Sequence, residues 1–204
     1  MQTFLPYASF TKSAKSLDGR RLNKQCLEAM QLLKLAEKLD AGEAVISNNN
    51  YTKHPAFLMW RGFELSLWHY ANAVFDEFAR RHKGTQHAWH RLLFDLCYYQ
   101  PTLDAPKPAW LGDNTVHSNH RARLLMKGEL DVLVGRIKQA EKQGVEIVLN
   151  RRLKYVRSYT LESLIAVNKQ LDEADIPRTP NFYKRFGWSE KMTDKNYWPC
   201  THSC

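Results

Sequence analysis

The sequence predicts a mainly α protein, built as one compact helical bundle, and three observations support this. Apolar residues recur every three or four positions in several long segments, whereas β-branched residues cluster only near 145–160. Glycine or proline follows most of these segments, as is common at helix ends. At 204 residues the chain can bury a core of its own. We therefore expect a single domain over 1–204, with a small irregular or β insertion near 145–160 and an aromatic and basic carboxy-terminal segment over 181–199.

The first two helices are predicted close to the amino terminus. A short helical piece covers Phe10 to Ser16, and a longer helix starts at Asp18, whose side chain can accept from the unpaired amides of the first turn. Gly42 ends that helix. The apolar positions expected on its buried face are Leu22, Cys26, Met30 and Leu33.

Four further helices are expected along the chain. The longest begins at His54-Pro55, because proline suits a first helical turn, and runs to about residue 84. The next helix covers 86–100 and ends before Pro101. Another starts with Asp113 or Asn114 as its cap and closes at Gly144, and the last follows Thr160 and ends before Pro177.

Composition points to a polyanionic partner. The formal net charge is +9, and aromatic residues make up 12% of a chain with 30 Lys and Arg, a combination suited to base stacking beside phosphate contacts. A tryptophan-rich core is the alternative use of the rings. No long apolar run predicts a membrane span, no secretory signal is recognised, and the four cysteines are too dispersed for a disulfide framework. These features favour the cytoplasm.

Residues 17–28 concentrate cations, amides and carboxylates. Spacings of three and four residues put Arg21, Lys24, Gln25 and Glu28 on one helix face, beside Arg20. The face is either a solvated surface with ordinary ion pairs or a contact surface for a polyanion. The excess of cations in a basic protein favours the polyanion.

Two other segments carry candidate binding residues. His117, His120 and Arg121 fall largely on one side of their helix, where the arginine argues for phosphate contact rather than a bound metal ion. Cys200, His202 and Cys204 offer three soft ligands, one fewer than a structural zinc site usually has. A metal-dependent hydrolase built on these residues together with His117 and His120 is one alternative function. Because the ligand set is incomplete, we expect no metal.

The segment Asn181–Trp188 alternates rings and cations. Its flat side chains can stack on unpaired bases while the cations hold phosphates, or the rings can close one end of the bundle. The residues concerned are Tyr183, Lys184, Arg185 and Trp188. His54 is either a helix-end contact to phosphate or base, or an ordinary loop histidine.

The sequence resembles the pyrimidine-dimer DNA glycosylase and endonuclease V family, particularly a bacterial branch of similar length. The matching blocks occur in family order and bracket almost the whole chain. They are the opening MQTFLPY, LDxxRLxKQxxE at Leu17–Glu28, His54-Pro55 with Met59-Trp60, Trp110-Leu111-Gly112 with His117–Arg121, and Phe186-Gly187-Trp188 with Tyr197-Trp198-Pro199. The resemblance implies a compact, mostly helical fold and cleavage of an N-glycosidic bond in double-stranded DNA, without a cofactor.

The resemblance also implies roles for individual residues. The family's catalytic glutamate follows a leucine by six residues, as Glu28 follows Leu22. Its nucleophile is the amino-terminal amine, which forms a Schiff base with the sugar and permits strand cleavage. Here Gln2 is bulky enough to discourage removal of the preceding methionine, so the amine would belong to Met1. If that amine cannot reach the sugar, Glu28 or Asp18 activates water or stabilises the cationic sugar, and no lyase activity follows.

The remaining expectations concern the DNA contacts, the substrate and the oligomeric state. Residues expected to contact DNA are Arg20, Arg21, Lys24, Gln25, His54, His117, His120, Arg121, Tyr183, Lys184, Arg185 and Trp188. The pyrimidine dimer is the family expectation, while a remodelled pocket could take hydroxymethylated or glucosylated pyrimidines of phage DNA as a defence. In a third alternative the protein only binds nucleic acid, and Glu28 pairs with Lys24. We expect a monomer.

Overall fold

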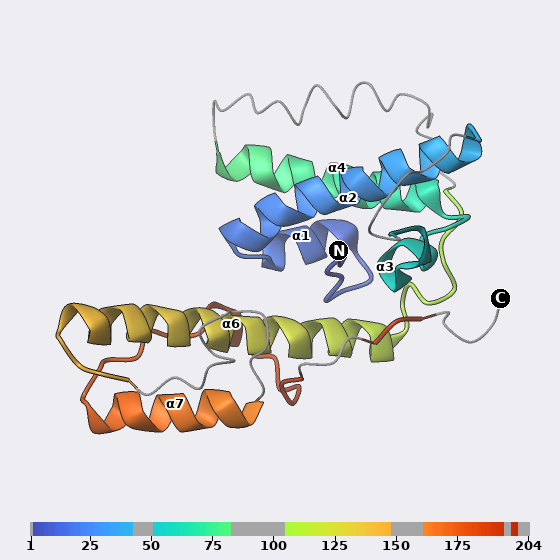
Figure 1. Cartoon of the computed structure of the whole chain (residues 1–204). Coiled ribbons are helices and arrows are strands. Elements are labelled where there is room, and N and C mark those ends of the chain that lie inside the picture. The colour runs from blue at the N-terminus through green and yellow to red at the C-terminus, as the bar shows by residue number, and fades with distance from the viewer. Residues whose placement is uncertain (1, 43–50, 83–104, 148–160, 194–196, 200–204) are drawn as a thin grey trace. The chain divides into compact units, whose positions relative to one another are not determined.

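The computed structural model describes residues 2–42, 51–82, 105–147, 161–193 and 197–199. Within these ranges the chain forms six α-helices and two short 3-10 helices, and no strand (Figure 1). The prediction of a mainly α fold is confirmed. The helix expected over 86–100 and residues 148–160 of the expected insertion lie outside the described ranges, and residues 145–147 have no regular structure.

The chain divides into two compact units. One contains residues 1–118 together with 197–204, and the other contains residues 119–196. Helix α6 (Asn114–Lys142) begins in the first unit and continues through the second. Because two compact units can belong to one folding domain, the single domain expected from the sequence stays a prediction.

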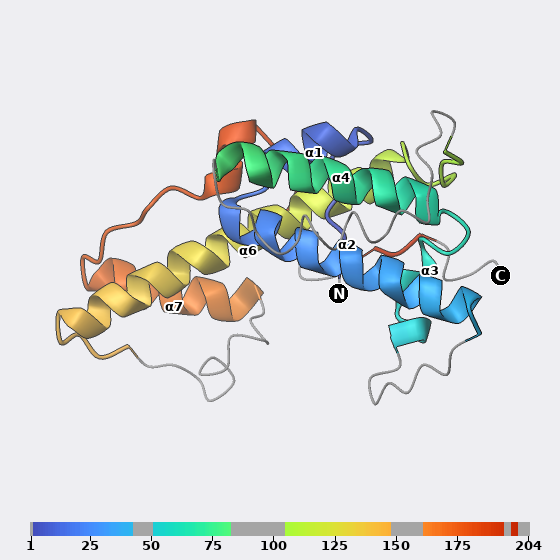
Figure 2. The same ribbon diagram turned by 90° about the horizontal axis from the view of Figure 1, so that it is seen from above.

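The core of the first unit is formed by helices α1 (Phe10–Ser16), α2 (Gly19–Asp40) and α4 (Glu64–Arg81). Helix α4 packs against both α2 and α1, as Figures 1 and 2 show from two directions. All four apolar residues that the periodicity of α2 assigned to its buried face are buried. The helix runs to Asp40, and Gly42 follows with φ of +70°, as expected for a glycine that ends a helix.

Arg81, near the end of α4, binds the end of α1 and the residue between α1 and α2. The guanidinium of Arg81 donates to the backbone oxygens of Lys15, at 3.0 Å, and Leu17, at 2.6 Å, and its Nε donates to Glu77. The carbonyls at the end of α1 have no helical partner, so this contact satisfies them. Next in the chain, Asp18 caps α2 by accepting from the amide of Arg21 at 2.9 Å, as the sequence predicted.

The predicted long helix after His54 is interrupted, which corrects the sequence-based expectation. It consists of α3 (Pro55–Leu58), preceded by the 3-10 helix η1 (Tyr51–Lys53), and of α4, with a turn over 59–63 between them. Gly62 has φ of +80° in this turn, a conformation that other residues rarely adopt. Glu64 stabilises the turn because its Oε1 accepts from the amide of Gly62 at 3.0 Å and from Arg61 at 2.9 Å.

The second unit is built on α6 and α7 (Leu161–Glu173), followed by the 3-10 helix η2 (Phe182–Phe186). Its apolar core comprises Met126, Leu133, Ile137, Ala140, Leu164, Val167, Leu171 and Ile176. The buried side chain of Arg136 donates to the backbone oxygen of Ile176, at 2.7 and 3.1 Å, and to Asp172 and Asn168. This arginine satisfies carbonyl and carboxylate groups around the end of α7.

Gly128 on α6 lies against Asn181. A Cβ added at Gly128 would stand 2.0 Å from Oδ1 of Asn181, whose side chain is buried. That side chain donates to the backbone oxygen of Leu125 at 2.9 Å and accepts from the amide of Tyr183 at 2.9 Å. Asn181 therefore cannot move away without losing buried hydrogen bonds.

Gly128→Ala is expected to destabilise the second unit by roughly 1–3 kcal/mol, because overpacking displaces Asn181. Gly135→Ala on the same helix is the matched control, since nothing lies within 4 Å of a Cβ added there. The control should gain about 0.5–1 kcal/mol from higher helix propensity. Urea denaturation followed by circular dichroism measures both, and an equal response of the two variants would contradict the close contact.

Candidate functional site

Glu28 occupies an unusual environment for a helix-surface carboxylate. It is on α2, the residue is only 7% exposed, and its Oε2 accepts from Nε2 of Gln25 at 2.8 Å. Its Oε1 lies 3.8 Å from Nζ of the exposed Lys24. The carboxylate thus has one oxygen held by the protein interior and the other on the side of a solvent-facing cation.

Gln25 makes four hydrogen bonds from a completely buried side chain. Nε2 donates to Glu28 and, at 2.7 Å, to the backbone oxygen of Gln2. Oε1 accepts from the amide of Phe4 at 2.8 Å and from the hydroxyl of Tyr70 at 2.6 Å. A primary amide has two donors and two acceptor sites, so every one of them is used. The partners also fix its orientation, since the Gln2 carbonyl can only accept and the Phe4 amide can only donate.

The sequence led us to expect that Gln25 contacts DNA, but in this structure its side chain lies in the interior. Its exposed fraction is 0%, and all of its hydrogen-bonding capacity is directed into the protein. The helical period placed it on the same face as Arg21 and Glu28, but residues 2–4 and Tyr70 cover that part of the face. Gln25 therefore positions Glu28 and the amino-terminal segment.

Tyr70 on α4 is the remaining member of the hydrogen-bond network around Gln25. Burial raises the pKa of its hydroxyl well above the usual range, so the group stays protonated and donates to Gln25. The backbone oxygen of Phe4 lies 3.1 Å from the same hydroxyl. Nothing in the sequence singled out Tyr70, which lies among apolar residues of its helix. A buried tyrosine hydroxyl needs a hydrogen-bond partner, and this is the one signal that could have indicated that Tyr70 belongs to a polar network.

Residues 2–5 are anchored along their whole length. The hydroxyl of Thr3 accepts from Nε1 of Trp60 at 3.1 Å, and the backbone oxygen of Leu5 lies 2.7 Å from Nδ1 of His117. Gln2 and Phe4 are held by Gln25. Gln2 is consequently fixed next to the partner of Glu28, and the amino terminus is one residue earlier in the chain. Met1, the expected nucleophile, lies outside the described residues.

His117, from which the sequence led us to expect a DNA contact, is buried in this structure. Because the Leu5 oxygen only accepts, Nδ1 carries the proton, and Nε2 accepts from the amide of Gly112 at 3.0 Å. Both ring nitrogens are thereby used within the protein. His117 joins the amino-terminal segment to the turn that precedes α6, and it offers neither nitrogen to a ligand.

The charged residues at the start of α2 divide into two groups. Both carboxylate oxygens of Asp18 are engaged by Arg21, one by its amide at 2.9 Å and one by its Nη1 at 2.5 Å. Arg20 and Lys24 are exposed. Asp18 is therefore a helix cap with a tightly paired arginine, whereas Arg20 and Lys24 face solvent and Lys24 lies next to Glu28.

His54 caps α3 with its ring. Nδ1 accepts from the amide of Ala56 at 3.0 Å, and the ring of Trp198 lies 5.9 Å away in an edge-on arrangement. Burial lowers the pKa of His54, and the positive charge of the amino terminus lowers it further. The imidazole is therefore neutral at pH 7, which favours hydrogen bonding over ion pairing with phosphate.

Two of the candidates in the second unit are not on its surface. His120 is completely buried, and the ring of Tyr183 is also buried, stacked 5.8 Å from that of Trp188. Arg121 forms an ion pair with Glu190. His120 and Tyr183 are thus core residues in this structure, although both were expected to contact DNA, and Arg121 already has a carboxylate partner.

The cations of η2 retain solvent exposure. The guanidinium of Arg185 stacks 3.7 Å from the ring centroid of Phe182, and Lys184 binds Glu129 at 3.0 Å while its side chain is 61% exposed. The ring of Trp188 stacks on Phe186. The segment therefore packs its own rings together, while closure of one end of the bundle by these rings and DNA contact by Lys184, Arg185 and Trp188 both stay predictions.

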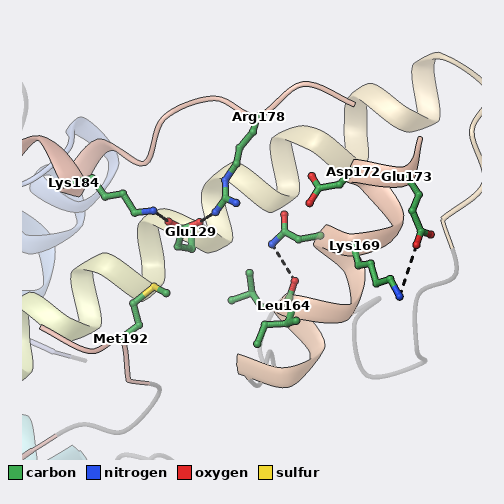
Figure 3. Close-up of a pocket in the computed structure, with 10 residues that line it drawn as sticks. Glu129, Leu164, Lys169, Asp172, Glu173, Arg178, Lys184 and Met192 are labelled. Atoms are coloured by element: carbon green, nitrogen blue, oxygen red, sulfur yellow. Dashed lines mark hydrogen bonds and ion pairs between the residues drawn. The ribbon is translucent and has the colours of Figure 1, made fainter. Parts of the chain in front are cut away.

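Lys184 also borders a pocket of about 710 Å³ in the second unit (Figure 3). At its base Glu129 binds Arg178, Lys184 and Asn181. Burial opposes ionisation of Glu129, but these hydrogen bonds outweigh it and lower its pKa. The other lining residues are Leu164, Ile165, Asn168, Lys169, Asp172, Glu173 and Met192. The carboxylates of Asp172 and Glu173 are also paired, with Arg136 and Lys169, so the pocket presents balanced charge.

No group of three or more His, Cys, Asp or Glu side chains within the described ranges could hold a metal ion. Cys200, His202 and Cys204 lie outside those ranges. None of the helices that the structure describes is long and apolar enough to cross a membrane.

Comparison with known proteins gives a match for the amino-terminal part of the chain. Residues 1–91 match the family model of pyrimidine dimer DNA glycosylases. The resemblance seen in the sequence is thereby confirmed over this range, which contains Glu28, Gln25, Tyr70 and residues 2–4. Searches of curated proteins and of solved structures found no match.

Gln25→Met, which keeps the volume but removes the amide, is expected to destabilise the protein by at least about 3 kcal/mol, because buried polar groups lose their partners. Tyr70→Phe removes a single hydroxyl and should cost less, roughly 1–2 kcal/mol. Chemical denaturation measures both variants. A Gln25→Met protein as stable as the original would contradict the network.

Proposed function

We propose that this protein is a DNA N-glycosylase, which cleaves the bond between the sugar and a damaged or modified pyrimidine in double-stranded DNA. The family match over residues 1–91 supports this class of reaction. The observation that carries the proposal is the buried carboxylate of Glu28, held by Gln25 beside residue 2. A surface ion pair would need neither the burial nor the fully satisfied amide.

An anion in this position suits glycosidic cleavage. As the bond to the base breaks, positive charge develops on the deoxyribose, and a fixed carboxylate stabilises it most where water is excluded. Glu28 is the better of the two candidate carboxylates, because both oxygens of Asp18 are engaged by Arg21. We assign Asp18 the role of helix cap and Glu28 the catalytic role.

The amine of residue 1 is our proposed nucleophile. Its lone pair attacks C1′, the base leaves with the electrons of the glycosidic bond and takes up a proton, and loss of a proton from the attacking nitrogen allows ring opening to a Schiff base. Elimination from that intermediate then cleaves the strand. If water attacks instead, with Glu28 accepting its proton, the products are the free base and an intact abasic site.

Exposed cations on the same helix provide for phosphate binding. Arg20 and Lys24 precede Glu28 on α2, and the side chain of Lys24 is 69% exposed despite its contact with the carboxylate. Such contacts position the backbone of the substrate without reading its sequence. The identity of the pyrimidine is open to a direct comparison of duplexes that carry a thymine dimer, hydroxymethylcytosine or its glucosylated form.

Glu28→Gln is expected to lower base release from the preferred duplex by about 100-fold or more, because the amide keeps the shape but lacks the stabilising charge. Chromatography of the released base measures activity, and gel shift measures binding, which should be retained. The matched control is Glu64→Gln, a second partly buried glutamate whose partners are Arg61 and Gly62. Unchanged release by Glu28→Gln would refute the catalytic assignment.

Borohydride is expected to trap a covalent adduct between the protein and the substrate strand, because it reduces a Schiff base to a stable amine. Peptide mass analysis should place the adduct on residue 1, and acetylation of that amine should abolish trapping. Base release without an adduct would assign the attack to water, while absence of both products from every duplex tested would remove the glycosylase proposal.

A further inference from the structure

Large apolar side chains are exposed at four positions among the described residues. These are Tyr51 at 39%, Leu58 at 47%, Ile165 at 64% and Tyr197 at 41%. A single exposed apolar residue needs no explanation, but a cluster does. Three of the four, Tyr51, Leu58 and Tyr197, belong to the first unit, and each is within four residues of His54 or next to its ring partner Trp198. We call these three residues the α3 patch.

Backbone and ring contacts bring the α3 patch together. The amide of His54 donates to the Tyr51 oxygen at 3.0 Å, and the amide of Leu58 donates to the His54 oxygen at 3.1 Å. Tyr197 immediately precedes Trp198, whose ring lies 5.9 Å from that of His54. The patch thus combines η1, α3 and the segment 197–199, which is remote in sequence (α3 is labelled in Figure 2).

The α3 patch adjoins the segment that holds Glu28. Met59 and Trp60 directly follow Leu58, and both contact Thr3, with Trp60 Nε1 donating to its hydroxyl at 3.1 Å and Met59 Sδ at 4.0 Å from it. Thr3 lies between Gln2 and Phe4, which Gln25 binds. Met59, Trp60 and Thr3 thus connect the patch to the residues that hold Glu28.

The chemistry of the patch fits unstacked bases. A glycosylase must expose its target nucleotide, and proteins often insert apolar or aromatic side chains beside the disturbed base step. Two tyrosine rings and a leucine supply such surfaces, and Lys53, exposed between Tyr51 and His54, supplies a positive charge for the adjacent phosphates. The net charge of +9 is consistent with the same polyanion.

We infer that the α3 patch contacts the bases next to the target nucleotide and stabilises the opened duplex. The inference rests on the proposed glycosylase function and adds surfaces that promote exposure of the nucleotide. The partner is duplex DNA, and the patch lowers the free energy that is needed to open it. Its contribution is therefore greatest when the target is fully stacked and paired, and smallest when mismatches have already weakened the pairing.

The test compares two duplexes that carry a thymine dimer, one with adenines opposite it and one with mismatched bases. The variants are Leu58→Ser and the triple variant Tyr51→Ser, Leu58→Ser, Tyr197→Ser. The triple variant is expected to release base about 10-fold or more slowly from the paired duplex, because stacking contacts are lost. On the mismatched duplex its rate should stay within about threefold of the original. Ile165→Ser, exposed but on α7, is the matched control and should behave as the original protein.

A second measurement does not depend on catalysis. In the Glu28→Gln background, 2-aminopurine next to the dimer should become more fluorescent on binding, and the triple variant should lose that increase. Equal slowing on both duplexes, or an unchanged fluorescence increase, would overturn the inference. Failure of the proposed function would give a different result from failure of this inference. The unaltered protein would then release no base, while the fluorescence would still report opening of the duplex.

Discussion

The first unit depends on one buried amide. Gln25 is placed where α2 and α4 pack together, and its four hydrogen bonds join both helices to residues 2 and 4. A buried amide left unsatisfied costs more than its hydrogen bonds contribute, so the alternatives to this arrangement are all unfavourable. The carboxylate of Glu28 and the path of the first residues are consequently fixed by the same side chain.

Features set by neighbours in sequence could be predicted. The cap at Asp18, the buried apolar face of α2 and the end of α6 before Gly144 follow from local hydrogen bonding, helical period and the freedom of glycine, and all are present. The break between α3 and α4 could not be predicted in this way. A single glycine is tolerated inside helices, and the interruption that contains Gly62 depends on Glu64 and Arg61, which stabilise the turn.

The candidate site shows the limit of helical period more clearly. Spacing correctly put Gln25 and Glu28 on one face, but whether that face meets solvent depends on residues 2–4 and on Tyr70, which are distant in sequence. The same applies to His117 and His120, where a surface pair was expected and both rings are buried. Polar residues that complete a core are indistinguishable by spacing from polar residues that bind a ligand, because both occupy a face next to apolar neighbours.

The ordered path of residues 2–5 has a practical consequence for recombinant protein. An affinity tag fused ahead of residue 1 would extend directly from a segment whose backbone is bonded to Gln25 and His117, and it would convert the terminal amine into an amide. Such a protein could fold and bind its ligand yet lack the one primary amine on which imine chemistry at this position depends. Purification through a removable tag that regenerates the free terminus avoids that ambiguity.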